Sequence, residues 1–202
     1  MSGFPSIAAV VAAAIVLPGC TAMTPPVEVT RFHNAQVAPI VPGSIAVEAN
    51  VPSEEDRKSL EYATYRAALL RELQRVGFSE SRDAGNGSQY IASYTLDRAI
   101  LSAGGSRSPV SVGVGGSTGS YGSGVGLGIG INLSGPPKDK IATDLSVRIS
   151  NRADGNVIWE GRASVEAKEG SPASQPGLAA AKLAEALFRD FPGASGTTIR
   201  VP

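Results

Sequence analysis

The chain has 202 residues, 42% of them hydrophobic, which is sufficient for one globular domain with a tail. Lysine plus arginine number 18, as do aspartate plus glutamate, so no overall charge attracts nucleic acid or an acidic substrate. The only cysteine is Cys20, which excludes an intramolecular disulfide.

The N-terminus has the features of an export signal. Residues Ile7 to Val16 form an uncharged apolar run that is too short to cross a bilayer, for which about 20 residues are needed. Leu17-Pro18-Gly19-Cys20 follows directly and resembles the signal of bacterial lipoproteins. An ordinary signal peptide, or a buried helix with an unrelated cysteine, is the alternative interpretation of this run.

The resemblance implies cleavage after Gly19, transfer of diacylglyceryl to the Cys20 thiol and acylation of the new amino terminus. Two or three acyl chains would hold the protein on a membrane, because one chain alone gives only marginal binding. Thr21, rather than an aspartate after the cysteine, resembles lipoproteins sorted to the outer membrane of Gram-negative bacteria. We therefore expect a cleaved signal peptide over residues 1–19 and a lipid anchor in the outer membrane, with the protein facing the periplasm.

The mature chain divides into a tether and a domain. Residues 20–43 are predicted to hold the lipidated cysteine, a short proline-bearing tether and a candidate first strand at Val27–His33. Residues 44–202 are predicted to form a single domain that begins with a strand at Ser44–Ala49. A glycine-rich insertion at about residues 102–140 interrupts this domain, since 12 of the 24 glycines of the chain lie between Gly104 and Gly135.

A helix is predicted to start at Ser53, a good N-cap followed by three acidic residues in the first turn. Spacings of three and four predict one apolar stripe for packing on a sheet. Gly77 is suited to the left-handed conformation that ends a helix, which would fold Phe78 back on Leu73. The predicted stripe consists of Leu60, Ala63, Ala67, Leu70 and Leu73.

The glycine-rich insertion follows a long strand predicted at Gln89–Leu101. Large apolar residues alternate with glycine from Val125 to Leu133, which indicates a strand with one apolar and one bare face. The favoured interpretation is a hairpin extending from the sheet, because only this one segment approaches the 9–11 residues of a lipid-facing strand. A membrane-inserting hairpin and a self-assembly edge are the alternatives. The candidate interaction residues are Val125, Leu127, Ile129 and Ile131.

A β-hairpin is predicted from Ile141 to Glu166. Both arms alternate apolar and polar residues, and Asp154-Gly155 between them tolerates a tight reversal. The second arm is predicted to direct Val157, Trp159, Gly161, Ala163 and Val165 to the buried side, with the tryptophan as its anchor.

A second amphipathic helix follows, with Pro176 at its first turn and Pro192-Gly193 at its end. A short edge strand is predicted at Thr197–Val201. The order of the elements predicts an α+β domain, a mostly antiparallel sheet with two helices packed on one face. The apolar residues of this helix are Leu178, Ala181, Leu183, Ala184, Leu187, Phe188 and Phe191.

Five segments in this order resemble the bacterial lipoproteins of the domain-of-unknown-function family numbered 4136. The resemblance covers roughly Val27 to Pro192 and implies an envelope location and this fold, but it implies no activity. The segments are Leu73–Phe78, Gln89–Tyr94, Asp144–Ile149, Asn156–Ala163 and Phe191–Pro192.

No motif of a catalytic, cofactor or metal site is found. His33 is the only histidine and has no triad partner beside it, and with an acylated cysteine it leaves no usual zinc ligand set. Phosphate-binding loops and dinucleotide fingerprints are absent. The strand carboxylates are better explained as cross-strand surface partners of arginines than as an acid–base pair. These residues are Asp144, Glu160 and Glu166, with Arg148 and Arg162.

The sequence therefore predicts a non-catalytic binding or scaffolding module. Its expected partners are the membrane, through the lipid on Cys20, and an envelope protein that the sequence does not identify. No metal, cofactor or nucleic acid is expected. The alternative is a self-associating envelope component that pairs copies through residues 125–133, and a hydrolase of unusual type is the third hypothesis.

Overall fold

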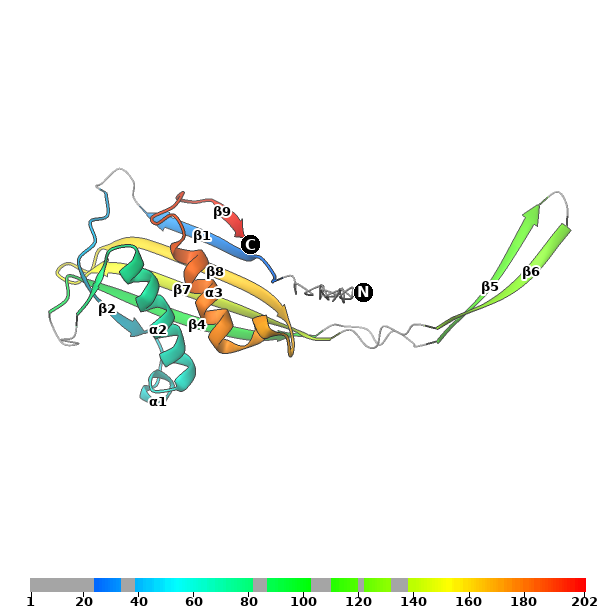
Figure 1. Ribbon diagram of the computed structural model, residues 1–202, viewed down its shortest axis with the longest axis horizontal. Coiled ribbons are helices and arrows are strands. Elements are labelled where there is room, and N and C mark those ends of the chain that lie inside the picture. Colours follow the sequence, from blue (N-terminus) through cyan, green and yellow to red (C-terminus); the bar gives the residue numbers. More distant parts are fainter. Residues whose placement is uncertain (1–23, 34–38, 82–86, 103–109, 120–121, 132–137) are drawn as a thin grey trace, which may run out of the picture.

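The computed structural model describes residues 24–33, 39–81, 87–102, 110–119, 122–131 and 138–202 (Figure 1). Its main sheet consists of β1 (Val27–His33), β2 (Ser44–Ala49), β3 (Ser79–Glu80), β4 (Tyr90–Leu101), β7 (Lys140–Asn151), β8 (Val157–Lys168) and β9 (Thr198–Val201). The helices are α1 (Glu54–Arg57), α2 (Leu60–Arg75), α3 (Pro176–Phe188) and a 3₁₀ turn, η1 (Pro172–Ser174). The predicted α+β class is confirmed, with a short third helix added.

The seven strands lie in the order β3-β2-β4-β7-β8-β1-β9. Every pairing from β4 to β9 is antiparallel, whereas β2 pairs in parallel with both β3 and β4. The parallel pairs arise because α2 connects β2 to the strands that follow, and a helical crossover returns the chain in the same direction. The sheet is thus mixed, although most of it is antiparallel as predicted.

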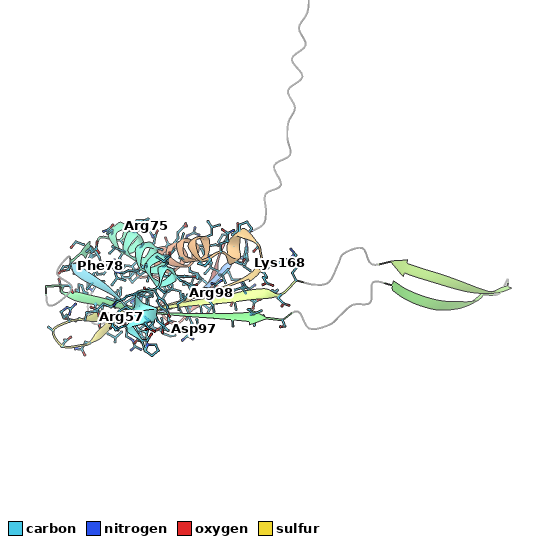
Figure 2. The ribbon with its side chains drawn as sticks, turned by 90° about the horizontal axis from the view of Figure 1, so that it is seen from below. Arg57, Arg75, Phe78, Asp97, Arg98 and Lys168 are labelled. Atoms are coloured by element: carbon cyan, nitrogen blue, oxygen red, sulfur yellow. The ribbon has the colours of Figure 1, made fainter. Side chains whose placement is uncertain are left out.

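Helices α2 and α3 lie side by side on one face of the sheet (Figures 1 and 2). The core between these layers contains large side chains with no exposed surface, among them Trp159, Tyr65, Phe188 and Leu183. Burial of apolar surface at roughly 25 cal/mol per Å² is the main stabilising contribution here. The opposite face of the sheet has no helix over it in the part of the chain that the structure describes.

The first predicted helix is divided in two. Ser53 caps α1 as expected, since its Oγ accepts a hydrogen bond from the Asp56 amide at 3.0 Å. Ser59 then acts as a second N-cap, accepting from the Tyr62 amide at 3.2 Å, and α2 starts at the next residue. A serine side chain competes with the helix for backbone groups, which explains the break.

The predicted apolar stripe of this helix was wrong in its position. Leu60 is 87% exposed, and Ala63 and Ala67 are exposed as well, whereas Leu73 is buried as predicted. The observed buried stripe includes Tyr65, whose ring removes more apolar area from water than an alanine side chain does. It consists of Tyr65, Ala68, Leu69, Glu72 and Leu73.

The end of α2 is the predicted Schellman motif. Gly77 has φ of +102°, the Phe78 amide donates to the Leu73 carbonyl at 2.9 Å, and the Gly77 amide donates to the Gln74 carbonyl at 3.1 Å. These bonds satisfy carbonyls that the helix itself leaves unpaired. Phe78 is consequently buried in the core, in edge contact with Tyr90.

The predicted hairpin is confirmed as β7 and β8, with Gly155 at φ of +72° in the turn. Trp159 is fully buried, and Gly161 lies so close that a Cβ there would be 2.5 Å from the indole. Val157 was predicted to be buried but is 46% exposed. A register shift between Ile149 and Ser150 adds a residue to β8 at this end, which removes Val157 from the alternation.

The last helix ends earlier than predicted. Its final residue is Phe188, so Phe191 lies beyond the helix, although it still packs on the core. Leu178 is 52% exposed because it lies in the first turn, away from the sheet. Pro176 occupies the first turn as predicted, and β9 forms the edge of the sheet beside β1.

The glycine-rich insertion contains two strands rather than one. β5 (Val110–Gly119) and β6 (Gly122–Ile131) pair antiparallel as a separate two-stranded sheet. The prediction recognised only the second, because β5 contains serine, threonine and adjacent glycines that are typical of loops. The favoured expectation of a hairpin extending from the sheet agrees with Figure 1, where β5 and β6 lie beyond the ends of β4 and β7.

Candidate functional site

The sheet face without helices carries the candidate site, which we call the open face. It is formed by alternate residues of β4, β7, β8 and β1, whose neighbours in the chain point to the core. The residues are small hydroxyls, charged groups and one aromatic: Thr30, Phe32, Ser93, Thr95, Asp97, Asp144, Ser146, Arg148, Glu160, Arg162 and Ser164.

The strand register arranges these residues in rows across the sheet. One row runs Ser93, Arg148, Glu160 and Phe32, and the Arg148 guanidinium is paired with the Glu160 carboxylate. The neighbouring row runs Thr95, Ser146, Arg162 and Thr30, in which Arg162 Nε donates to Ser146 Oγ at 3.3 Å. In both rows small hydroxyl side chains thus lie next to long charged ones.

Two hollows lie on this side of the molecule. The first hollow, of about 420 Å³, lies over the middle of the open face and is lined by residues of both rows. A second hollow, of about 460 Å³, lies where β1 ends and β8 begins, around His33, Val157 and Ser195. Phe32 and Glu160 line both hollows. Phe32 is 53% exposed, so an aromatic ring accessible to a partner separates the two concave regions.

His33 has a structural setting at the end of β1. Its Nε2 donates to the Gly193 carbonyl at 2.8 Å, and its backbone exchanges hydrogen bonds with Ser195 Oγ at 3.1 and 3.0 Å. This agrees with the prediction of a strand-end histidine. Among the described residues there is no group of three or more His, Cys, Asp or Glu side chains arranged to hold a metal ion.

The predicted surface carboxylates share the open face. Glu160 forms the expected cross-strand ion pair with Arg148, whereas Glu166 pairs across the strands with Lys140, at 3.0 Å, and not with an arginine. Asp144 differs, because the register places Asp97 directly opposite it. Burial raises the pKa of the Asp144 carboxyl, Arg162 opposes this and Asp97 adds to it.

The raised pKa of Asp144 predicts a pH-dependent contribution to stability. Since the folded state holds this proton more tightly than the unfolded chain, the ionised carboxylate destabilises the fold at neutral pH, and the penalty disappears as pH falls through the folded pKa. Asp144→Asn is therefore expected to raise the free energy of unfolding slightly at pH 7, with a difference that narrows towards pH 4. Urea denaturation across this range measures it. Glu160→Gln, which loses an ion pair, should show no gain, and an equal gain in both variants would contradict this cause.

The predicted lipidation residues, Gly19 and Cys20, lie outside the described residues. The predicted interaction residues lie on β6, where Val125, Leu127, Ile129 and Ile131 occupy one face of the ribbon and pair with Gly116, Val114, Val112 and Val110 of β5. No helix among the described residues is long and apolar enough to cross a membrane.

Sequence reasoning missed the hydroxyl residues of the open face and Phe32. Thr30, Ser93, Thr95 and Ser146 are ordinary residues of exposed strand positions, and nothing in their spacing indicates that four strands bring them together. Phe32 gave one usable signal: in the alternation of β1 it falls out of phase with Val27 and Val29, which predicts an exposed aromatic.

Comparison with known proteins places this fold in a family. Residues 44–193 match the model of the family described as Domain of unknown function (DUF4136). The chain belongs to this family. The DUF4136 match begins at β2 and ends just beyond α3, so β1 and β9 complete the sheet from outside it.

An uncharacterized protein of Zymomonas mobilis subsp. mobilis is 31% identical to this chain in sequence. The match covers 88% of this chain and 81% of the length of that protein. A solved structure of a PDZ domain protein from Parabacteroides distasonis has a TM-score of 0.51 at 11% identity and covers 88% of this chain. That likeness shows the fold alone, and the DUF4136 protein spans only 39% of the PDZ domain protein. A PelC dodecamer from Paraburkholderia phytofirmans has a TM-score of 0.43 at 10% identity, covering 80% of this chain and 94% of that one.

Proposed function

We propose that this DUF4136 protein is a lipoprotein, anchored by the lipid on Cys20 in the outer membrane and facing the periplasm. It acts there as a non-catalytic module that binds or scaffolds another envelope protein. The lipoprotein-like sequence Leu17-Pro18-Gly19-Cys20 supports the anchor. The proposal includes no metal, cofactor or nucleic acid.

The exposed ring of Phe32 between two hollows carries the binding part of this proposal. Interface energy is concentrated in a few aromatic or arginine side chains surrounded by groups that exclude water. Phe32 has this setting, with Arg148, Glu160 and Arg162 beside it and small hydroxyls around them. A partner that covers Phe32 would also meet the hydrogen-bonding side chains of the first hollow, whereas Val157 and Ile158 line the second hollow.

The position of Phe32 along β1 agrees with a tethered binding module. The tether enters the domain at Val27, and Phe32 lies five residues further, about 17 Å along the strand at roughly 3.3 Å per residue. The hollows thus lie towards the end of the sheet opposite to the tether entry. A membrane-bound protein with this orientation presents Phe32 away from the bilayer, where a periplasmic partner has access.

A photo-crosslinking amino acid at position 32, introduced in cells, tests the binding surface. The matched control is position 178 on α3, because Leu178 is 52% exposed and Phe32 is 53% exposed, on opposite faces of the sheet. We expect an adduct with a discrete envelope protein from position 32 only, lost when Arg162→Glu is added. The same adducts from both positions, or none from position 32, would count against the open face.

Self-association is the second candidate function. Among the described residues β5 and β6 pair only with each other, so each strand has an edge on which backbone groups are available to another chain. If copies pair there, sedimentation of the purified protein depends on concentration, and Leu127→Lys abolishes the larger species. Gly128→Lys, which adds the same charge at a position of the other face, is the control.

A further inference from the structure

The β5–β6 ribbon has two chemically different faces. The register places Val110, Val112 and Val114 of β5 on one face, opposite the large apolar residues of β6. The other face carries Ser111, Gly113 and Gly115, opposite glycines of β6. Both strands are ten residues long. Two segments of the chain, and not one, therefore have the 9–11 residues of a strand that faces lipid.

The ribbon lies within a long stretch without charge. No Lys, Arg, Asp or Glu occurs in residues 108–137. Arg107 precedes this stretch, and Lys138-Asp139-Lys140, with a net positive charge, follows it. An uncharged amphipathic segment with basic residues next to it is typical of contact with a lipid surface, whose headgroups attract cations.

The end of the sheet from which the ribbon departs has the same character. Ile100 is 66% exposed and Leu101 is 40% exposed at the end of β4, although both are large apolar residues. In the strand register they lie opposite Ile141 and Lys140. Lys140 lies opposite Lys168 of β8, and its ammonium forms an ion pair with Glu166. Figure 2 shows Lys168 at this end of the domain, towards the ribbon. This end of the sheet thus combines exposed apolar side chains with lysines, as the uncharged stretch of residues 108–137 and its basic neighbours do.

The tether reaches the domain at this same end. β1 begins at Val27, next to the last residues of β8, and Lys182 of α3 donates to the Pro25 carbonyl at 2.7 Å, which holds the tether against the domain. β8 separates β1 from β7, so Val27 and Lys140 lie two strand spacings apart across the sheet, about 10 Å. Along the strand direction the register also separates them by about 10 Å. Cys20 lies seven residues before Val27, within about 25 Å of extended chain.

We propose that the β5–β6 ribbon is a second membrane contact, lying on the bilayer with its Val110, Val112, Val114 and Leu127 face towards the acyl chains. This inference rests on the proposed lipid anchor, which brings this end of the domain to the membrane. The ribbon lies in the interface and does not span the bilayer, because a two-stranded ribbon leaves backbone groups on both edges that hydrocarbon cannot satisfy. Together the anchor and the ribbon hold the domain in one orientation, with Phe32 directed to the periplasm.

An environment-sensitive fluorophore on a single introduced cysteine tests this contact. Full-length Val112→Cys protein is labelled and reconstituted in vesicles of phosphatidylethanolamine and phosphatidylglycerol, with or without brominated acyl chains. Ser111→Cys, its neighbour on the other face, and Ser93→Cys on the open face are the controls. We expect a blue shift and loss of fluorescence in brominated vesicles at position 112, a smaller loss at 111 and none at 93.

Equal quenching at positions 112 and 93 overturns the proposal. A blue shift at 112 without quenching by brominated lipid also overturns it, in favour of a second copy of the chain covering this face. The wild type, treated with the same dye, reports separately on the anchor, because an acylated Cys20 takes up no label. Dye uptake by the wild type therefore contradicts the lipid anchor, whereas the readout at position 112 decides on the ribbon.

Discussion

Replacing Trp159 with alanine is expected to lower the free energy of unfolding by about 3–5 kcal/mol. The indole has no exposed surface and stacks on Phe188, with ring centroids 5.2 Å apart. Its Nε1 donates to the Pro192 carbonyl at 3.1 Å, so the same side chain joins β8, α3 and the segment after α3. Alanine leaves a cavity at this junction and an unpaired carbonyl as well.

Urea denaturation followed by far-ultraviolet circular dichroism measures this effect, since Trp159 is the only tryptophan and fluorescence is lost with it. Phe32→Ala is the matched control, because it removes an aromatic ring of the same sheet that is 53% exposed. The control should cost less than about 1 kcal/mol, as surface substitutions usually do. Similar losses in both variants would contradict the assignment of Trp159 as the anchor of the core.

Arg31→Met is expected to destabilise the fold by about 2–4 kcal/mol, since each buried acceptor left unpaired costs about 1–3 kcal/mol. The Arg31 side chain is only 3% exposed, and its Nε and Nη2 donate to the carbonyls of Leu187 and Ala186 at 2.9 and 2.7 Å. These carbonyls belong to the last turn of α3, where a helix has no internal donors and where a cation is favoured. Burial lowers the pKa of Arg31, which Asp190 opposes, and the group is still cationic at neutral pH.

Arg31→Lys should be intermediate, because a lysine presents a point charge and does not reproduce the two directed bonds. Arg200→Met is the surface control: Arg200 lies on β9 beside β1, and its ion pair with Glu28 is exposed. Denaturation by urea is the measurement. If Arg31→Met proves as stable as Arg200→Met, then Arg31 does not join β1 to the end of α3 in the way described.

Local patterns predicted the elements that depend on neighbouring residues. The Gly77 cap, the β7–β8 turn at Gly155 and the buried Trp159 were all predicted, because capping, turn geometry and alternation involve residues close in sequence. The stripe of α2 was misplaced since two sets of residues at helical spacing compete there. Only the sheet determines that the face with Tyr65 is buried.

Features that depend on distant segments were not predicted. Nothing near Arg31 indicates that the end of α3, more than 150 residues later, will bury its guanidinium. The parallel pairing of β2 with β4 and the rows of the open face likewise depend on strand order, which alternation alone does not specify. The Phe32 site is therefore a product of the tertiary fold.

Radiolabelled palmitate incorporation into the wild type and Cys20→Ala, each followed by membrane fractionation, tests the central claim most directly. The proposed anchor predicts label and an outer-membrane location in the wild type, and loss of both in Cys20→Ala. A wild type that takes no label and is released in soluble form would contradict the lipid anchor.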